Sequence, residues 1–334
     1  MKIDKTVLVV GGAGYVGMVI SEMLLSDGYR VRCIDDMVYR QTIDNEHILS
    51  NQNYQFLKVD LRDHHRFDEI FDGVSDVVIL AGLVGDPITK KYPVLAYSVN
   101  EEGMVELINT AKSRAVGKLV FVSTCSNYGL ITSNELADEN HPLQPLSLYS
   151  KAKVAIERYI LDTKFSTGCC PVILRFATAF GLSPRMRFDL TVNEFSRDLA
   201  LGKELLVYDA DTWRPYCHVK DFGRLVGTVL ESNNSEVCGQ VFNAGGNDNN
   251  ATKRMLVELI QKRIPNSRVV YKSHGTDPRN YRVDFSKVKA VLGFEPRYSI
   301  EQGVDEIISE VLAGKFPEGS DPNLYGNYLI PGAK

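Results

Sequence analysis

The run Thr6-Val7-Leu8-Val9-Val10-Gly11-Gly12-Ala13-Gly14-Tyr15-Val16-Gly17 decides the fold that this chain is expected to adopt. A short apolar strand leads into glycines with the spacing GxxGxxG, and a helical pattern follows them. Glycines let the backbone turn tightly and approach a pyrophosphate, which then sits at the positive N-terminus of the helix. A plain tight turn would also account for the glycines, but their place between the first strand and the first helix favours a dinucleotide site.

The rest of the first half repeats this order of strand and helix. Nearly continuous apolar runs predict strands at Thr6–Val10, Arg30–Asp35, Tyr54–Asp60, Asp76–Ala81, Lys118–Thr124 and Pro171–Phe176. Amphipathic patterns between them predict helices at about Tyr15–Asp27, Val94–Ser113 and Tyr149–Thr163. Strands without polar alternation belong to parallel sheets that are covered on both faces. The expected fold class is therefore α/β, with a doubly wound, Rossmann-type parallel sheet.

The second half has a looser rhythm and is expected to form a smaller α/β lobe that binds substrate. Its patterns predict helices at about Arg185–Lys203, Val219–Leu230, Ala251–Ile264 and Ile300–Ala313. They predict strands at Leu205–Tyr208, Gln240–Ala244 and Val269–Lys272. We expect one domain of residues 1–177 plus about 215–245, and a lobe of residues 178–214 and 246–334. The tail after Phe316 is rich in proline, glycine and asparagine, so it either drapes over the surface or is partly disordered.

Composition excludes several classes of protein. The chain has 334 residues, of which 44% are hydrophobic, which suits a large α/β domain with a second lobe. Its net charge of −4 argues against nucleic acid as the main partner. No apolar run reaches about 18 residues and no signal peptide is visible, so no membrane association is expected. Six cysteines without a CxxC pair or a metal-ligand spacing predict reduced thiols, no metal site and a cytoplasmic location.

Carboxylates at two strand ends bear on the cofactor. Asp35 and Asp36 end the second strand, where an acidic residue accepts hydrogen bonds from the adenosine ribose hydroxyls. Two adjacent carboxylates would repel a 2′-phosphate, which favours NAD over NADP, although Arg32 and Arg40 keep NADP open. The Asp60-Leu61 pair closes the third strand, and its carboxylate either meets the adenine amine or simply caps the strand.

A second motif carries the chemistry. In Tyr149-Ser150-Lys151-Ala152-Lys153 the tyrosine and the second lysine are four residues apart, so they share one face of a helix. A lysine ammonium near a phenol stabilises the phenolate and lowers the tyrosine pKa, which makes the tyrosine a usable base. A surface tyrosine and lysine would also fit this spacing. The strand ending at Ser123 and Thr124 adds weight, because its hydroxyl would point into the crevice where open α/β sheets bind ligands.

These motifs continue through the chain. In the first half they are Gly11–Gly17, Asp35, Leu80-Ala81-Gly82, Asn100, Ser123–Gly129 and Tyr149–Lys153. In the second half they are Leu174–Thr178, Ser183–Arg187 and Arg214–Asp221. Together they resemble, over nearly the whole chain, the extended short-chain dehydrogenase/reductase family that acts on sugar nucleotides, of which UDP-galactose 4-epimerase is the familiar branch. The last two runs look closest to a branch that includes bacterial GDP-heptose 4-dehydrogenases.

The resemblance implies a role for each matching position. Tyr149 would be the base, Lys153 its electrostatic partner and Thr124 the residue that positions the reacting hydroxyl. NAD would be bound by Gly11, Gly14, Tyr15, Val16, Gly17, Asp35, Asp36, Asp60, Leu61, Leu80, Ala81, Gly82, Asn100, Ser123, Tyr149, Lys153 and Phe176. The nucleotide sugar would be bound by Thr124, Thr178, Asn193, Arg214 and Arg279. A guanidinium fork suits phosphate oxygens, although Arg279 could be a surface charge and Arg282 competes for its role.

One departure from the family narrows the activity. Sugar 4,6-dehydratases of this kind place Asp and Glu directly after the threonine, where this chain has Cys125 and Ser126. A thiol and a hydroxyl do not easily replace that acid/base pair, so dehydration is not expected. Cys125 fits a buried small hydrophobic residue better than a catalytic acid.

The implied reaction is NAD-dependent oxidation or reduction at a hydroxyl carbon of a nucleotide-activated sugar, most simply at C4. A 4-epimerase, a 4-dehydrogenase and a 4-ketoreductase would use the same residues, and a non-catalytic NAD(H)-binding regulator on the same fold stays open. By resemblance, the helices at about 94–113 and 149–163 would pair with a second copy in a homodimer.

Overall fold

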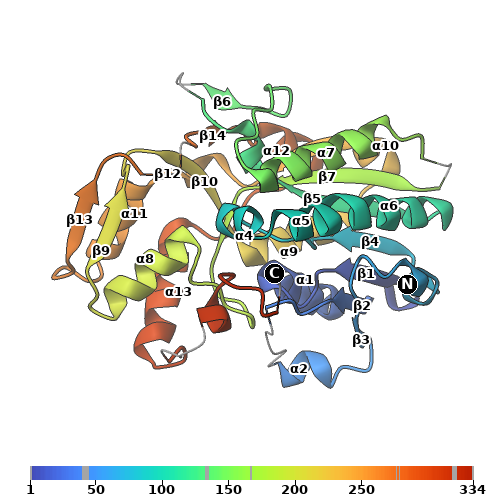
Figure 1. The fold of residues 1–334 in the computed structure, drawn as a ribbon, viewed down its shortest axis with the longest axis horizontal. Helices are drawn as coiled ribbons and strands as arrows, with labels where there is room; N and C mark the ends of the chain where they lie inside the picture. The colour runs from blue at the N-terminus through green and yellow to red at the C-terminus, as the bar shows by residue number, and fades with distance from the viewer. Residues whose placement is uncertain are drawn as a thin grey trace.

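The computed structural model describes residues 2–39, 45–131, 135–165, 168–275, 277, 279–317 and 322–332, and it shows a large sheet-based lobe beside a smaller one (Figure 1). A parallel sheet of seven strands, in the order β11-β7-β5-β4-β1-β2-β3, forms the centre of the large lobe. The strands are β1 Thr6–Val10, β2 Arg30–Asp35, β3 Tyr54–Lys58, β4 Asp76–Ile79, β5 Lys118–Thr124, β7 Cys170–Phe176 and β11 Gln240–Ala244. The predicted doubly wound α/β fold is confirmed.

Helices cover both faces of this sheet because its strands are apolar on both sides. Val7 and Val9 of β1 join a core with α1 (Tyr15–Ser26), α9 (Val219–Glu231) and α12 (Ser286–Leu292). Leu8 and Val10, which point the other way, join a core with α3 (Phe67–Phe71), α6 (Met104–Ser113) and α7 (Leu148–Asp162). Because all seven strands are parallel, their carboxyl ends meet at one edge of the sheet, toward the smaller lobe.

The smaller lobe packs around its own apolar core. Three strands, β8 (Thr178–Phe180), β10 (Trp213–His218) and β12 (Asn250–Thr252), form one sheet. Two-stranded pairs are β9 (Leu205–Tyr208) with β13 (Val269–Lys272), and β6 (Leu136–Ala137) with β14 (Arg282–Val283). Around the core lie α8 (Thr191–Ala200), α11 (Lys253–Gln261) and α13 (Ile300–Leu312).

Short elements complete the described chain. The remaining α-helices are α2 Glu46–Leu49, α4 Asp86–Lys91, α5 Pro93–Tyr97 and α10 Asn234–Val237. Single turns of 3-10 helix are Lys2–Asp4, His64–Arg66, Cys125–Tyr128, Asn247–Asn249 and Pro322–Tyr325. Among the described residues, no helix combines the length and the apolar character that crossing a bilayer requires.

Two predicted helices differ in the structure. The helix expected at Val94–Ser113 is a continuous helical stretch that consists of α5, a π-helical segment at Ser98–Gly103 and α6. Gly103 packs closely on Leu61, since an added Cβ would lie 3.0 Å from the Leu61 carbonyl oxygen. The helix expected at Arg185–Lys203 begins only at Thr191. The residues before it form an irregular segment that reaches toward α1, as described below.

The expectation that every cysteine is reduced is wrong for Cys170 and Cys238, which form a disulfide. Cys170 begins β7, and Cys238 lies two residues before β11, its parallel neighbour. Parallel pairing brings the starts of these strands together, so the two Cα atoms are 4.9 Å apart. The other four cysteines are buried thiols. The cytoplasmic location stays a prediction.

Candidate active site

A cavity of about 560 Å³ lies at the carboxyl ends of the central strands, between the two lobes. This is where open α/β sheets bind ligands. Of the residues proposed from the sequence, its wall includes Gly11, Gly14, Tyr15, Val16, Gly17, Asp35, Asp36, Asp60, Leu61, Leu80, Ala81, Gly82, Ser123, Thr124, Tyr149, Lys153, Phe176, Thr178, Arg214 and Arg279. Asn100 and Asn193 lie outside it.

The glycine turn packs so tightly against its own backbone and the end of β4 that side chains cannot be placed there. A Cβ on Gly11, whose φ is +82°, would lie 2.7 Å from the Ala81 backbone. A Cβ on Gly17 would lie 2.4 Å from the Gly11 carbonyl oxygen. Gly14 caps the N-terminus of α1 with extended backbone, so the helix dipole points into the cavity. This cradle fits the pyrophosphate of a dinucleotide.

Asp35 is placed to meet an adenosine ribose beside that turn. Its two carboxylate oxygens accept hydrogen bonds from Met37 N (2.8 Å) and Ala13 N (3.2 Å), while burial raises the pKa of the carboxyl. Arg32 points elsewhere, since it donates to the Gln55 side chain and to the backbone carbonyls of Glu69, Ile70 and Asp72. Arg40 lies outside the described residues. Arg32 is thus held away from the place beside Asp35 that a 2′-phosphate would occupy.

Asn100 supports the cofactor end from behind. Its side-chain amide accepts from Leu83 N (2.7 Å) and donates to Leu83 O (3.0 Å), and it is 7% exposed. These bonds fix the turn after β4 that carries Gly82, whose φ is +141°. The structure therefore gives Asn100 a positioning role and no place in the cavity wall.

Thr124, Tyr149 and Lys153 face the same cavity from β5 and α7. The capping box of Ser147 and Ser150 starts α7 where Tyr149 can face inward. Lys153 is 6% exposed, its Nζ donates to Val122 O (2.8 Å), and it lies 6.0 Å from the Tyr149 ring centre. Burial lowers the pKa of Lys153 to about 8 and raises that of Tyr149, whose nearby cations Arg187 and Arg279 oppose the rise.

A buried ion pair that was not predicted from the sequence holds these groups in place. Glu157 follows Lys153 by one helical turn, and its carboxylate bonds Arg175 Nη2 on β7 (2.8 Å). Ser123 Oγ and Asn127 Nδ2 donate to the same carboxylate. Because the pair joins β5, α7, β7 and the turn at Cys125–Tyr128, it fixes the surroundings of Thr124. Tyr149, Lys153 and Glu157 follow one another at intervals of four residues, so they share one face of α7, and this spacing could have pointed to Glu157 from the sequence.

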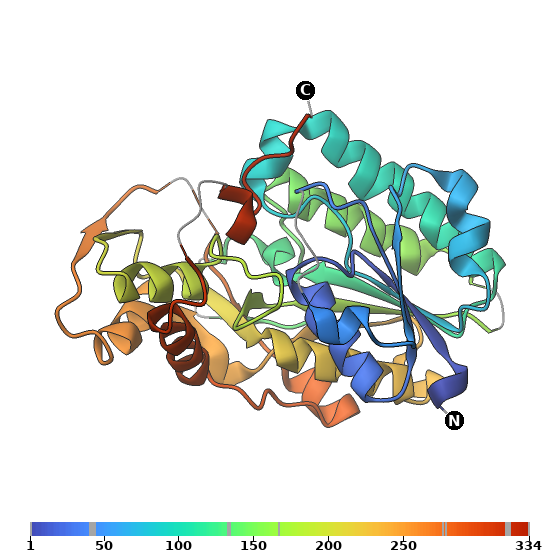
Figure 2. The same cartoon turned by 90° about the horizontal axis from the view of Figure 1, so that it is seen from below.

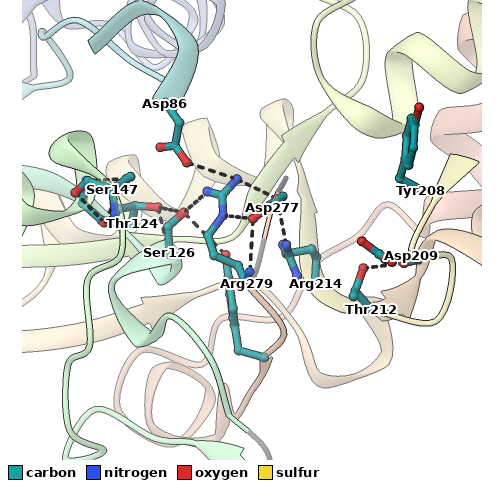
Figure 3. A network of polar contacts seen from close by, with 12 residues as sticks. Asp86, Thr124, Ser126, Ser147, Tyr208, Asp209, Thr212, Arg214, Asp277 and Arg279 are labelled. Carbon is teal, nitrogen blue, oxygen red and sulfur yellow. Dashed lines mark hydrogen bonds and ion pairs between the residues drawn. The ribbon is translucent and has the colours of Figure 1, made fainter. Parts of the chain in front are cut away.

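Charged residues of the smaller lobe gather at the other end of the cavity (Figure 3). Asp277 joins two arginines, accepting from Arg214 Nη2 (2.9 Å) and Arg279 Nε (2.7 Å). Figure 3 shows Arg279 between Asp86 and Ser126; its Nη1 lies 3.5 Å from Ser126 Oγ, which bonds Thr124 (2.9 Å). Arg279 therefore lies nearer to the reacting end than Arg214 does.

Asn193 and Cys125 are engaged by the protein itself. Asn193 is fully buried; its amide accepts from Gly181 N (3.0 Å) and donates to Tyr15 OH (3.0 Å) and Arg187 O (2.9 Å). All of these bonds are internal to the protein, and a role of Asn193 in substrate binding stays a prediction. Cys125 is 1% exposed and donates to the Arg175 carbonyl, and burial raises its pKa, which fits a packed residue.

Several cavity residues were not foreseen from the sequence. They include Arg185, Arg187 and Glu194, and Asn327 and Tyr328 from the C-terminal tail. Burial beside Asp198 and Asp189 raises the pKa of Glu194 to about 7. The described part of the tail is packed, since Ile330 is 7% exposed. Arg185 and Arg187 belong to the Ser183–Arg187 run that the sequence singled out, but the run itself does not show what they contact. Long-range packing brings all of these residues to the site.

Comparisons with known proteins agree with this geometry. A model of the NAD dependent epimerase/dehydratase family matches residues 7–245. A UDP-glucose 4-epimerase of Rhizobium meliloti is 29% identical over 330 residues, covering 89% of this chain and 94% of that protein. The crystal structure of Thermotoga maritima UDP-glucose 4-epimerase with UDP-glucose superposes with a TM-score of 0.82 at 25% identity, covering 94% of this chain and all of that one. Thermus thermophilus UDP-glucose 4-epimerase in complex with NAD gives 0.78 at 25% identity, covering 92% and 98%.

Proposed function

The chain belongs to the NAD dependent epimerase/dehydratase family, and on that premise we propose that it oxidises and reduces C4 of a nucleotide-activated sugar, as a 4-epimerase or a 4-dehydrogenase. Its cofactor is NAD. One observation carries the proposal: Thr124, Tyr149 and Lys153 line the same cavity as the glycine turn and Asp35. Relatives with similar sequence and structure act as UDP-glucose 4-epimerases.

Tyr149 is the proposed base. Burial raises the pKa of its phenol, so ionisation needs positive charge close by. Lys153 supplies part of that charge, and its bond to the Val122 carbonyl holds the ammonium in place. Thr124 orients the sugar oxygen while Tyr149 takes its proton. Bound NAD would accept the hydride that leaves the sugar carbon.

Two outcomes follow once the 4-keto sugar has formed. If the sugar turns in the cavity and is reduced on its other face, the protein is a 4-epimerase. If the keto sugar leaves, the protein is a 4-dehydrogenase, or a 4-ketoreductase working in reverse. Dehydration is not proposed, because Cys125 is buried away from the cavity and Ser126 cannot replace a carboxylate.

A homodimer is part of the proposal. The outer surfaces of α5 and α7 carry large apolar side chains that a lone chain exposes: Val94 (82%), Tyr97 (54%), Leu148 (45%) and Leu161 (47%). Burying them against a second copy would remove apolar area from water. Sedimentation at micromolar concentration tests this, and a stable monomer would contradict it.

The experiment for the activity begins with the protein as purified. Bound nucleotide is released by denaturation and identified by mass, and a panel of UDP, GDP, CDP and dTDP sugars is then offered to the native protein. Isomerisation without net change in cofactor absorbance indicates an epimerase, whereas net reduction or oxidation of the cofactor indicates a dehydrogenase or reductase.

Tyr149→Phe separates an enzyme from a non-catalytic NAD(H)-binding regulator. It should lower turnover by at least about 100-fold, the usual contribution of a general base, while NAD stays bound. Lys151→Met, an exposed change on the same helix, is the matched control and should leave turnover unchanged. If no sugar of the panel reacts with the wild-type protein while NAD is bound, the regulator becomes the better description.

A further inference from the structure

An irregular segment between β8 and α8 is anchored against the first turn of α1. Tyr15 OH donates to the Gly181 carbonyl (2.6 Å), and Ser183 Oγ donates to the Tyr15 carbonyl (2.7 Å). These two buried bonds join the smaller lobe to the helix whose N-terminus faces the glycine turn. Arg185 follows two residues later, so the chain brings it to the cofactor end of the cavity.

Arg185 is a buried cation that forms no ion pair with a described residue, although Asp189 and Asp35 act on it from farther away. It is 5% exposed and lines the cavity, and its Nε has no hydrogen-bond partner among the described residues. Nη2 donates to two neutral acceptors, Gly326 O (3.0 Å) and Asn327 Oδ1 (2.7 Å). The neighbouring Arg187, by contrast, is neutralised by a two-point contact with Asp189. Burial and the charge of Arg187 lower the pKa of Arg185 to about 10, as expected for a guanidinium that lacks a counter-charge.

Its environment points to the dinucleotide as the missing anion. The Arg185 guanidinium lies 5.7 Å from the centre of the Tyr39 ring, in the segment after β2, and Asp35 is among the charges that act on it. Arg214 and Arg279, by contrast, lie at the end of the cavity that is lined by the smaller lobe and are paired with Asp277. A guanidinium opposite a helix N-terminus is a suitable partner for a pyrophosphate, because both supply positive charge and donors.

The C-terminal segment, residues 322–332, covers Arg185 and crosses between the lobes. Tyr325 O accepts from Phe188 N (2.6 Å), and Asn327 N donates to Asp189 (3.3 Å), which fixes its start to the smaller lobe. Ile330 packs with Tyr39, Leu83 and Ile88 of the large lobe. Figure 2 shows the segment running from beside α8 to α4. Leaving the cofactor end of the cavity therefore means passing a segment that is anchored on both sides.

We propose that Arg185, held from behind by Gly326 and Asn327, binds the pyrophosphate of NAD, and that the C-terminal segment thereby retains the cofactor from one turnover to the next. A cofactor that stays bound can give the hydride back to a keto sugar in the same cavity. This role of Arg185 concerns NAD alone and does not depend on which sugar reacts.

The test measures release of NAD from the loaded protein. The holoenzyme is diluted into NAD-free buffer that contains an NAD-consuming enzyme, and the release rate is followed. Arg185→Ala should release NAD roughly 10- to 100-fold faster, the range of a charged hydrogen bond to phosphate. Asn327→Ala should accelerate release by a smaller factor, because it removes only the support of Arg185. Arg263→Ala, on the outer surface of the smaller lobe and paired with Asp305, is the matched control and should release NAD at the wild-type rate.

Three results would overturn the proposal. Unchanged NAD release from Arg185→Ala would do so, provided circular dichroism shows an intact fold. Weaker binding of UDP and GDP with unchanged NAD release would assign Arg185 to the substrate diphosphate instead. If Arg185→Ala does not fold, Asn327→Ala decides, and wild-type release from that variant rejects the retaining role of the segment. If no sugar of the panel reacts, the proposed reaction is refuted, but the release rates of NAD still test the role of Arg185.

Discussion

Replacing Glu157 by glutamine should destabilise the fold by about 3–5 kcal/mol, because it leaves the buried charge of Arg175 without its counter-charge. The two side chains are only 2% and 5% exposed. Glutamine keeps the size of the side chain but brings an amide donor to a place where Arg175, Ser123 and Asn127 all donate. At least one buried donor then loses its acceptor, which by itself costs about 1–3 kcal/mol.

Urea denaturation of the NAD-free protein measures this loss, with the slope against denaturant expected to stay unchanged. Glu69→Gln is the matched control: its pair with Arg66 is 52% and 35% exposed, so about 0.2–1 kcal/mol is expected. Combining Glu157→Gln with Arg175→Met should recover part of the stability, because the unpaired charge is removed. A loss below about 1 kcal/mol for Glu157→Gln alone would refute the reasoning.

Three further predictions concern the site. Lys153→Met should stabilise the NAD-free protein at pH 7 by up to about 3 kcal/mol, since burial lowers the lysine pKa from 10.5 to about 8. Between these two pKa values Lys153 binds more protons in the unfolded wild-type chain than in the folded one. The free energy of unfolding of the wild-type protein should therefore rise from pH 8 to pH 10.5, and urea titrations should find no such rise in the variant. Gly17→Ala should abolish NAD retention in a mass assay, because the added Cβ meets Gly11 O at 2.4 Å. Burial of Asp277 is outweighed by its bonds from Arg279, so the pKa of its carboxyl is lowered. The stability that this gives is present above pH ~4 and is lost on acidification. Between pH 5 and pH 3 the melting temperature of Asp277→Asn should therefore fall less than that of the wild type.

Local patterns carried the prediction of the large lobe and of the cofactor end. The strand before Gly11 is buried on both faces, and a side chain on Gly17 would meet Gly11 and Gly12 of the same turn. Tyr149 and Lys153 were recognisable because residues four apart share one face of a helix wherever that helix lies. Asp35 was recognisable because the end of the second strand is set by the same local order.

Residues that act through distant contacts could not be predicted in this way. Arg185 depends on Gly326 and Asn327, which follow it by more than a hundred residues. The bonds of Asn193 to Gly181 and to Tyr15, which hold the segment after β8 beside α1, join residues far apart in the chain. The disulfide of Cys170 required knowing that β11 pairs with β7. In each case the partner is fixed by the tertiary fold, on which spacing along the chain carries no information.

Because β11 forms the edge of the central sheet, the large lobe is not a single continuous segment of the chain and cannot be cloned apart from the smaller lobe. The strand that completes the sheet, Gln240–Ala244, is encoded after much of the smaller lobe and pairs in parallel with β7. A fragment that stops at residue 177 would leave β7, a strand buried along its whole length, as a bare edge that can recruit other chains. Domain-swapping or library projects that cut at the apparent boundary should therefore yield aggregates, whereas exchanges that retain residues 219–244 keep the sheet closed.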